Sequence, residues 1–518
     1  MTAPRLLVLG LALLVVRGAR AQAPADTLAT VSVDTRRPGR TIPRDFIGYS
    51  LEVSTAGQGI GAFQGANAGG GQQAEQSIYA LGRPDAPNQV YFHLMHNLGA
   101  GILRLGGNSQ DNTCWDRAQA PHPDACQAGL DSADLALWAT AAHASGWKLI
   151  VGLNLKQNDP AWALREVTEG IARVIPRRFV FALEPGNEPD LFGRTPYRPQ
   201  PYTAADQARE FMAYARAFQG DPAARRYALA GPATCCGWRT PADLAVFLAG
   251  THPAPLKLVT VHNYSATTCG GQTVSIARLL SPELMDRVGE ETARLAAMAS
   301  THRVPISMAE TNSASCGGMP GVSNAFASAL WGLDYAFTLA RRGFVGVDFH
   351  TSYRPGGGSS YNPVDTYARQ DSAGQWHYRN VAEPLYYALH LFARHASGAQ
   401  LLVDSVVTSR NVRSYATTPC VQCRVDVFVL NKDTTASGPV RVHIGRRMGE
   451  ATLLLLSAPS LGSLAADISY AGRQFGDDGG IGAAHTVVVQ PDAAGDYTFE
   501  LPNAAIALLT VWAKGRRP

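Results

Sequence analysis

The chain has 518 residues, of which 46% are hydrophobic and 17% are charged, and its formal net charge is +4. This composition predicts an ordered globular protein with room for more than one domain. The small net charge gives no case for nucleic acid as a partner, and no segment beyond the N-terminal twenty residues is apolar enough to suggest a membrane span.

Residues 1–21 are typical of an export signal. Arg5 supplies the basic start, residues 6–16 form a short apolar core, and Ala19-Arg20-Ala21 matches a cleavage site. The apolar run is short for a membrane anchor, so we expect its removal. Eight cysteines fit an oxidising compartment. The sequence therefore predicts a secreted or periplasmic protein with no membrane attachment after processing.

Strand-like and helix-like patterns alternate over residues 44–395, after an N-terminal segment, 22–43, that contains a strand-like run at 28–33. The eight apolar runs of the alternating region are Phe46–Glu52, Ile102–Gly106, Lys148–Leu155, Phe179–Gly186, Tyr227–Pro232, Leu258–Tyr264, Pro305–Glu310 and Gly346–His350. Eight such alternations predict an α/β fold, a (β/α)8 TIM barrel.

The sequence pattern changes over residues 396–518. Short β-rich runs, separated by turn residues, replace the helical patterns. This region predicts a C-terminal β-sandwich. We expect the strand-like run at 28–33 to join it and so complete the sandwich.

Two of the apolar runs deliver a carboxylate at the carboxyl end. Glu188 follows the fourth run within Asn187-Glu188-Pro189, and Glu310 ends the seventh, 122 residues later (310 minus 188). Parallel barrels place catalytic side chains at this end of their strands, and paired carboxylates are the machinery of glycoside hydrolysis. By contrast, Glu166 lies in a helical, charge-mixed stretch and is expected to face solvent.

Side chains near the two glutamates have supporting roles in this reading. Asn187 can donate a hydrogen bond to a sugar hydroxyl. The hydroxyl of Tyr264, at the end of the sixth run, is expected to hold the Glu310 carboxylate. Arg104, in the second run, is expected to supply positive charge below it. A nucleophilic carboxylate needs such donors to stay ionised.

Longer strings extend the pattern. They are Leu103-Arg104-Leu105-Gly106-Gly107-Asn108, His262-Asn263-Tyr264, Met308-Ala309-Glu310-Thr311-Asn312-Ser313 and residues 326–331. Together with the two glutamates they resemble glycoside hydrolase family 79, the β-glucuronidase and heparanase family of the retaining clan A glycosidases. The resemblance implies that Glu188 is the acid/base, that Glu310 is the nucleophile, and that a covalent glycosyl-enzyme forms. His262 is expected to support the two glutamates.

Further sugar contacts are predicted at the ends of other strands. Glu52 ends the first run, and Asp111 follows the second; both are expected to face the pocket mouth. After the eighth run comes a glycine-rich segment that holds Tyr353, Arg354 and Tyr361. Backbone N–H groups of such a turn, two tyrosine hydroxyls and one guanidinium suit the carboxylate of a uronic acid.

The sequence thus predicts an exported retaining β-glucuronidase that removes terminal β-linked glucuronic acid, or its 4-O-methyl form, from a glycan or glycoside. Endo cleavage of an acidic polysaccharide, as in heparanase, is the alternative, and an inactive carbohydrate-binding barrel is a third. A serine hydrolase is unsupported because no Gly-x-Ser-x-Gly occurs. No metal-ligand motif is recognised, so we expect no metal and no cofactor.

The cysteines predict three bridges, although spacing alone does not fix connectivity. Cys269 and Cys316 follow neighbouring strands, so a bond between them would fix the loop beyond Glu310. Cys114 and Cys126 are expected to close the loop after the second strand. Cys420 and Cys423 precede an alternating strand rather than a helix, which favours a hairpin staple over a redox site.

Overall fold

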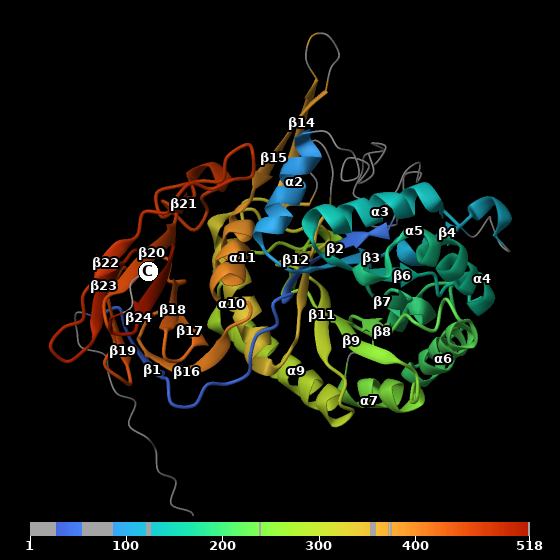
Figure 1. Cartoon of the computed structure of the whole chain (residues 1–518), viewed down its shortest axis with the longest axis horizontal. Coiled ribbons are helices and arrows are strands. Elements are labelled where there is room, and N and C mark those ends of the chain that lie inside the picture. Colours follow the sequence, from blue (N-terminus) through green and yellow to red (C-terminus); the bar gives the residue numbers. More distant parts are fainter. Residues whose placement is uncertain are drawn as a thin grey trace, which may run out of the picture.

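The computed structural model describes residues 27–53, 86–120, 126–237, 240–352, 359–370, 372 and 376–515. The predicted export signal, with Tyr353 and Arg354, lies outside these ranges. Two bodies stand side by side, a barrel ringed by helices and a layered β-structure (Figure 1). No helix among the described residues is long and apolar enough to cross a membrane.

The predicted barrel is present, and its eight parallel strands close in chain order. They are β2 (Ile47–Glu52), β3 (Ile102–Gly106), β6 (Lys148–Leu153), β7 (Val180–Pro185), β8 (Leu229–Thr234), β9 (Leu256–His262), β11 (Ile306–Thr311) and β13 (Val347–His350). The strand ends differ from the predicted ones by a few residues. In particular, β9 ends at His262, so Tyr264 lies in the loop beyond it.

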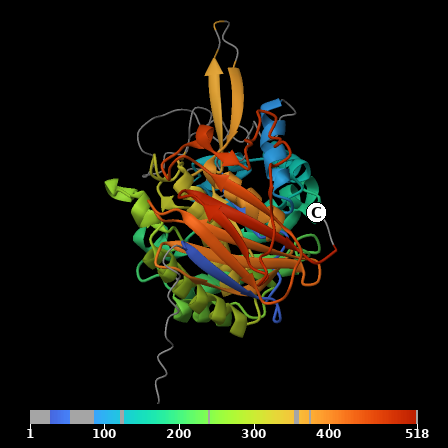
Figure 2. The ribbon, with the colours of Figure 1, turned by 90° about the vertical axis from the view of Figure 1, so that its left-hand side faces the viewer.

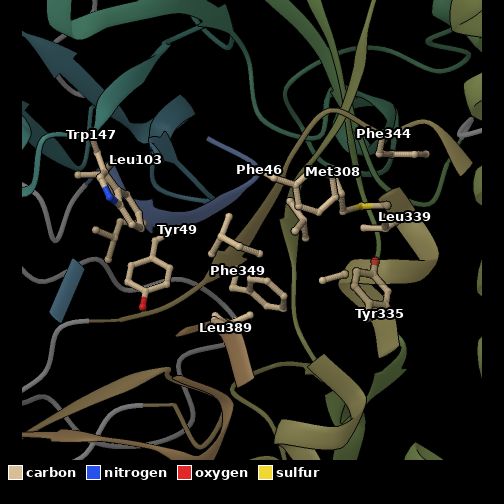
Figure 3. Close-up of a cluster of buried hydrophobic side chains, with 14 of the residues drawn as sticks. Phe46, Tyr49, Leu103, Trp147, Met308, Tyr335, Leu339, Phe344, Phe349 and Leu389 are labelled. Carbon is tan, nitrogen blue, oxygen red and sulfur yellow. The ribbon is translucent and has the colours of Figure 1, made fainter. Parts of the chain in front are cut away.

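Helices cover the outside of the barrel. The longer ones are α2 (Ala86–Asn97), α3 (Ser132–Ser145), α6 (Ala204–Gly220), α7 (Pro241–Gly250), α9 (Pro282–Thr301), α10 (Phe326–Arg342) and α11 (Pro384–His395). Two of these helices begin at capping boxes: Asp131 caps α3 and Thr203 caps α6. Figure 3 shows how Tyr49 and Phe349 from the strands meet Tyr335 and Leu389 from α10 and α11 in one apolar layer.

The interior of the barrel is layered. Ile102, Ala182 and their counterparts on three other strands form a small apolar cluster. Two residues further along the same strands stand Arg104 and Glu184, both fully buried. Because side chains alternate along a strand, each pair shares the inward face. The chain therefore places charged groups one layer above an apolar floor, at the carboxyl ends of the strands.

The C-terminal region is one ten-stranded sheet that folds over itself. Its strands are β1 (Ala29–Asp34), β16 (Gln400–Val407), β17 (Val412–Cys420), β18 (Arg424–Asn431), β19 (Gly438–Ile444), β20 (Ala451–Ser457), β21 (Ser469–Tyr470), β22 (Val487–Val489), β23 (Tyr497–Leu501) and β24 (Ala505–Trp512). β16 belongs to both layers: residues 400–402 pair with β17 and residues 403–407 pair with β1. The layers enclose a shared valine-rich core, which is the predicted sandwich.

The expected N-terminal strand takes its place in this sheet. β1 lies between β16, to which it is antiparallel, and β19, to which it is parallel. Figure 2 shows it, in blue, among the orange and red strands of the C-terminal region. The first described strand is therefore held by two strands from the far end of the chain.

Helix α10 joins the two bodies. Every residue from Phe326 to Ala340 is buried, because the barrel covers one side of the helix and the sheet the other. Phe337 stacks on Tyr415 of β17, with ring centroids 4.5 Å apart. Asp334 accepts hydrogen bonds from Tyr415 and from Lys432, both buried. The barrel and the sheet therefore share a continuous apolar core that contains the buried Asp334–Lys432 ion pair.

A two-stranded hairpin, β14 (Val364–Gln370) and β15 (Trp376–Ala382), was not predicted. It rises from the barrel between β13 and α11 and projects beyond the rest of the molecule (Figures 1 and 2). Its sequence mixes polar and aromatic residues and makes no clean apolar face. Sequence patterns detect strands by the surface they bury, so a projecting hairpin gives little signal.

Candidate active site

Glu310 is the penultimate residue of β11, and its carboxylate is held at both oxygens. Arg104 donates from Nη1 to Oε2 over 2.9 Å, and the Tyr264 hydroxyl donates to Oε1 over 3.0 Å. Only 7% of Glu310 is exposed. The predicted contacts of Tyr264 and Arg104 with this carboxylate are both present. Two fixed donors orient the carboxylate and favour its ionised form.

Burial alone would raise the pKa of Glu310. The His350 and His262 rings act the other way, as do the Arg104 guanidinium and the Tyr264 hydrogen bond. Together they hold the pKa well below its usual range. Arg104 is charged at every relevant pH and donates directly to the carboxylate.

Glu188 lies just beyond β7 in the left-handed backbone region, with φ 48° and ψ 51°. Such a conformation costs a non-glycine residue about 1–3 kcal/mol and persists only where the surroundings enforce it. Here the Glu188 N–H donates to the carbonyl of Ala233 over 2.9 Å, and Pro189 starts a short 3-10 helix, η7 (Pro189–Arg194). This backbone turn aims the acid from β7 across the end of β8.

The Glu188 carboxyl has the opposite electrostatics to Glu310. Burial is the first cause that raises its pKa well above the usual range, and the charges of Glu310 and Asp190 add to it. His262 Nδ1 lies 3.0 Å from Oε1 of Glu188. Burial, followed by the Arg104 charge, lowers the pKa of His262 to about 4. The surroundings therefore favour the protonated form of Glu188 and the ionised form of Glu310.

The two carboxyl groups are close. One oxygen each of Glu188 and Glu310 and one ring nitrogen of His262 lie within 4.8 Å of one another. Retaining glycosidases space their carboxyls about 5–5.5 Å apart, whereas inverting ones leave about 6.5–9.5 Å for a water. The spacing suits direct attack by one group while the other transfers a proton.

Arg104 is the hub beneath the pair. Besides Glu310, its guanidinium donates to Glu184 over 2.6 Å, to Ser50 over 3.1 Å and to the Asn187 carbonyl oxygen over 2.8 Å. The side chain folds back over its own strand. A Cβ on Gly106 would lie 2.6 Å from the guanidinium carbon. The first glycine of Leu105-Gly106-Gly107 is thus required by the arginine two residues before it.

Glu52 and His350 form the wall at β2 and β13. The Glu52 carboxylate accepts from the Asn108 and Ser109 backbone N–H groups, at 3.1 and 2.7 Å. His350 lies between the two acids: its Nε2 is 3.8 Å from Glu52 and its Nδ1 is 3.7 Å from Glu310. About a fifth of the Glu52 side chain is exposed, so it can still meet a sugar hydroxyl.

The prediction that Asp111 faces the pocket mouth is wrong. Asp111 is 2% exposed, and both its oxygens accept backbone N–H groups. Oδ1 receives Leu155 and Lys156, and Oδ2 receives Asn187. A carboxylate surrounded by main-chain donors ties three loops together. It positions Asn187 from behind instead of contacting substrate.

Tyr361 completes the described part of the pocket. Its ring lies 6.3 Å from the Tyr264 ring and 6.2 Å from the His350 ring, and 5% of the residue is exposed. Parallel pairing of β10 (Ala266–Thr267) with β12 (Ala314–Ser315) joins the loops after β9 and β11, and the predicted Cys269–Cys316 disulfide locks them. The predicted Cys114–Cys126 and Cys420–Cys423 bridges are also present.

Two clusters among the described residues have the donor types of a metal site. In the first, Glu188, His262 and Glu310, the Arg104 guanidinium lies 2.9 Å from the Glu310 carboxylate and disfavours a second cation. In the second, Asp190 with Cys235 and Cys236, the two sulfurs are joined in a disulfide. A disulfide lacks the thiolates that bind metals. Neither set fits a resident ion well.

Sequence reasoning missed Glu184, His350 and Asp190. Glu184 carries a usable signal, because a carboxylate inside the apolar run from Phe181 to Pro185 requires a charged partner when the strand is buried. Its partner is Arg104. His350 and Asp190 give no comparable signal, since each stands at a strand end or loop where polar residues are ordinary.

Comparisons with known proteins point the same way. A β-glucuronidase of Neurospora crassa is 25% identical over 395 residues, which is 68% of this chain and 65% of that protein. A β-glucuronidase of Aspergillus niger is 26% identical over 317 residues, 54% of each chain. The chain thus spans less than two thirds of the length of these relatives. No protein-family profile matches it.

A solved structure aligns with a larger share of the chain than these relatives do. The 4-O-α-L-rhamnosyl-β-D-glucuronidase of Fusarium oxysporum aligns with a TM-score of 0.72 at 19% identity, over 93% of this chain and all of that one. Further neighbours include an arabinofuranosidase of Xanthomonas axonopodis with a TM-score of 0.65 at 13% identity. At these identities the likeness shows the fold, a (β/α)8 barrel with an attached β-structure, and neither an activity nor a sugar.

Proposed function

We propose that this protein is a retaining β-glucuronidase. One observation carries the chemistry. The carboxyl groups of the buried Glu310 and the partly buried Glu188 lie within 4.8 Å of the same imidazole and of one another, and their surroundings push their pKa values in opposite directions. Such a split assigns the acid and the nucleophile. Glu188 is the acid/base, and Glu310 is the nucleophile.

The proposed reaction has two displacements. Glu310 attacks the anomeric carbon, the bond to the glycosidic oxygen breaks, and Glu188 gives that oxygen its proton. The sugar is then joined to Glu310 as an ester. Glu188, now ionised, takes a proton from water as the water attacks the same carbon, and Glu310 leaves as a carboxylate. The configuration at the anomeric carbon is retained.

Neighbouring side chains have positioning roles in this scheme. Tyr264 and Arg104 keep the Glu310 carboxylate oriented before attack. The Asn187 carbonyl oxygen accepts a hydrogen bond from Arg104, so its NH2 group is the donor left for the sugar. A hydrogen bond to the 2-hydroxyl that strengthens in the transition state supplies part of the rate in this class of enzyme.

The choice of glucuronic acid, or its 4-O-methyl form, is supported by the two β-glucuronidase relatives and by the strings that resemble glycoside hydrolase family 79. We propose that the carboxylate binds the loop after β13, through backbone N–H groups and through Tyr353, Arg354 and Tyr361. Tyr361 lies beside Tyr264 at the site, which supports this placement. Glu52 would accept a bond from a sugar hydroxyl.

Removal of a terminal residue is favoured over endo cleavage, because the net charge of +4 gives little support for a long basic cleft along an acidic polymer. A heparanase-like endo-enzyme is the second candidate. We also propose export, on the leader-like residues 1–21 and on four disulfides among the described residues.

The test is a side-by-side assay of the purified protein on 4-nitrophenyl β-glucuronide, β-glucoside and β-xyloside. We expect turnover of the glucuronide above the other two by at least tenfold, with β-glucuronic acid as the first product by NMR. An α-configured first product would contradict retention. Equal rates on all three would contradict the uronate assignment. Shortening of heparan sulfate with no monosaccharide release would support the endo alternative.

A further inference from the structure

Two adjacent cysteines stand where β8 ends. Cys235 and Cys236 follow Thr234 directly and are joined by a disulfide, with their Cα atoms 3.8 Å apart. Cys235 is half-buried and Cys236 is exposed. The chemistry of hydrolysis gives neither sulfur a part. Their place, next to the strand that carries the acid/base, raises the question of what they hold.

They hold Asp190. The Asp190 carboxylate accepts the backbone N–H groups of Cys235, at 3.1 Å, of Cys236, at 2.9 Å, and of Gly237. Asp190 is 5% exposed. A Cβ on Gly237 would lie 2.5 Å from the Asp190 carbonyl oxygen, so the turn fits against Asp190 with no side chain between them. Any change in the backbone of this turn therefore moves Asp190.

Asp190 in turn is close to the acid. It is the second residue of η7, which starts immediately after Glu188. The strand that leads into the cysteine turn also contacts the acid, because the N–H of Glu188 donates to the carbonyl of Ala233 in β8 over 2.9 Å. The acid/base loop is thus held by one bond to the end of β8 and by the bonds of the Asp190 carboxylate to the cysteine turn.

We propose that the Cys235–Cys236 disulfide is a positioning element for Glu188. A bond between adjacent cysteines closes a small ring that includes their shared peptide unit, so it fixes the backbone whose N–H groups bind Asp190. Without the bond, that peptide unit regains torsional freedom, and Asp190 and the acid/base loop lose a fixed support. This inference rests on the proposed function.

The location also predicts which step is affected. The acid protonates the glycosidic oxygen, so the leaving group departs on its side of the pocket. The titratable and charged groups around Glu188 are His262, Glu310, Arg104, Glu52, Tyr264 and Asp190. Of these groups, only Asp190 bonds to the cysteine turn in the described structure. Burial and the charge of Glu310 raise the pKa of Glu188, and the charge of Asp190 raises it further.

The experiment compares the full-length variant C235S/C236S with C420S/C423S, which removes another short-range disulfide on the distant sheet. Both are assayed on 4-nitrophenyl β-glucuronide, whose leaving group needs little protonation, and on methyl β-glucuronide, whose leaving group needs it. We expect C235S/C236S to lose about tenfold in kcat on the methyl substrate and less than twofold on the nitrophenyl one. The alkaline limb of its kcat/KM profile should move to lower pH.

Three further measurements close the test. D190N should move the alkaline limb the same way, because it removes the charge. A dithiol is oxidised to its own cyclic disulfide as it converts the pair to two thiols. At a dose that leaves the Cys269–Cys316 bridge intact by peptide mapping, it should reproduce the effect in wild type but add nothing to C235S/C236S. Alkylation and mass spectrometry of unreduced wild type should find Cys235 and Cys236 unmodified.

Several results would overturn the inference: free or metal-bound thiols at Cys235 and Cys236 in the purified protein, an equal loss on both substrates, or an unchanged alkaline limb in a folded C235S/C236S. The control variant should match wild type in all assays, and a matching shift there would likewise overturn it. If wild type hydrolyses neither glucuronide, the proposed function itself fails, which is a separate outcome.

Discussion

The ring of His262 is fully buried, and its Nδ1 lies 3.0 Å from Oε1 of Glu188. Burial and the nearby Arg104 charge keep this ring neutral near neutral pH. A neutral imidazole does not take the acid's proton in an ion pair, yet it can orient the carboxyl through one hydrogen bond. In the proposed reaction, Glu188 therefore keeps its proton for the leaving group.

The two glutamates should respond differently to loss of charge. E310Q should abolish turnover of every glucuronide, because an amide does not attack the anomeric carbon. E188Q should lose about 10²–10⁴-fold on methyl β-glucuronide, in line with general acid catalysis, and much less on the first step with a nitrophenyl leaving group. Pre-steady-state burst kinetics would measure the rate of that first step. Equal losses for both variants on both substrates would contradict the assigned roles.

Removing the Tyr264 hydroxyl should move the acidic limb of the pH profile. The nucleophile must be ionised, and the hydrogen bond from Tyr264 is one cause of the low pKa of Glu310. In Y264F that pKa rises, so the acidic limb of kcat/KM moves to higher pH. Y497F is the matched control, since the Tyr497 hydroxyl donates to Gly449 in the sheet. A limb that moves equally in both variants would refute this role.

Glu166 should make the protein less stable as pH rises. It was expected to face solvent, but it is 5% exposed, and burial raises its pKa to about 8. Between the unfolded value near 4.3 and this value the folded state holds the extra proton, so stability falls with pH over that range. E166Q should therefore raise the melting temperature at pH 8, with the gain vanishing below pH 4. A gain that is the same at both pH values would argue against this cause.

The Cys269–Cys316 bridge should contribute more stability than the Cys420–Cys423 bridge. The first closes a separation of 47 residues and the second of 3. Chain entropy then gives about 4 and about 2 kcal/mol. C269S/C316S should lower the free energy of unfolding accordingly, and it should raise KM, because it frees the loop beyond Glu310. Denaturant unfolding and steady-state kinetics measure both, and a smaller loss than in C420S/C423S would contradict the entropic account.

Much of the frame could be predicted from the sequence. Buried parallel strands give continuous apolar runs in the sequence. Their order along the chain and the positions of Glu188 and Glu310 at strand ends could therefore be predicted. Tyr264 could be placed beside Glu310 because it follows β9, the strand next to the one that carries Glu310. The alternating runs of the C-terminal region predicted its β-structure correctly. The pairing of β16 with both layers could not be predicted from composition.

Other features depend on contacts that sequence does not encode locally. Asp111 reads as a loop acid, and only the approach of the Leu155 and Asn187 N–H groups turns it inward. The hairpin β14–β15 buries too little to show a pattern. Cys235 and Cys236 gave no pairing signal, because adjacent cysteines are not expected to bond to each other.

The pairing of β1 also sets an order of events during synthesis. β1 emerges first among the described strands, but both its partners, β16 and β19, lie some 370 residues or more further along the chain. Until those residues leave the ribosome, β1 has an open edge on each side, while the barrel between can already close. β1 therefore pairs only after most of the chain has been made, and we expect tags or deletions near residue 29 to impair maturation more than catalysis.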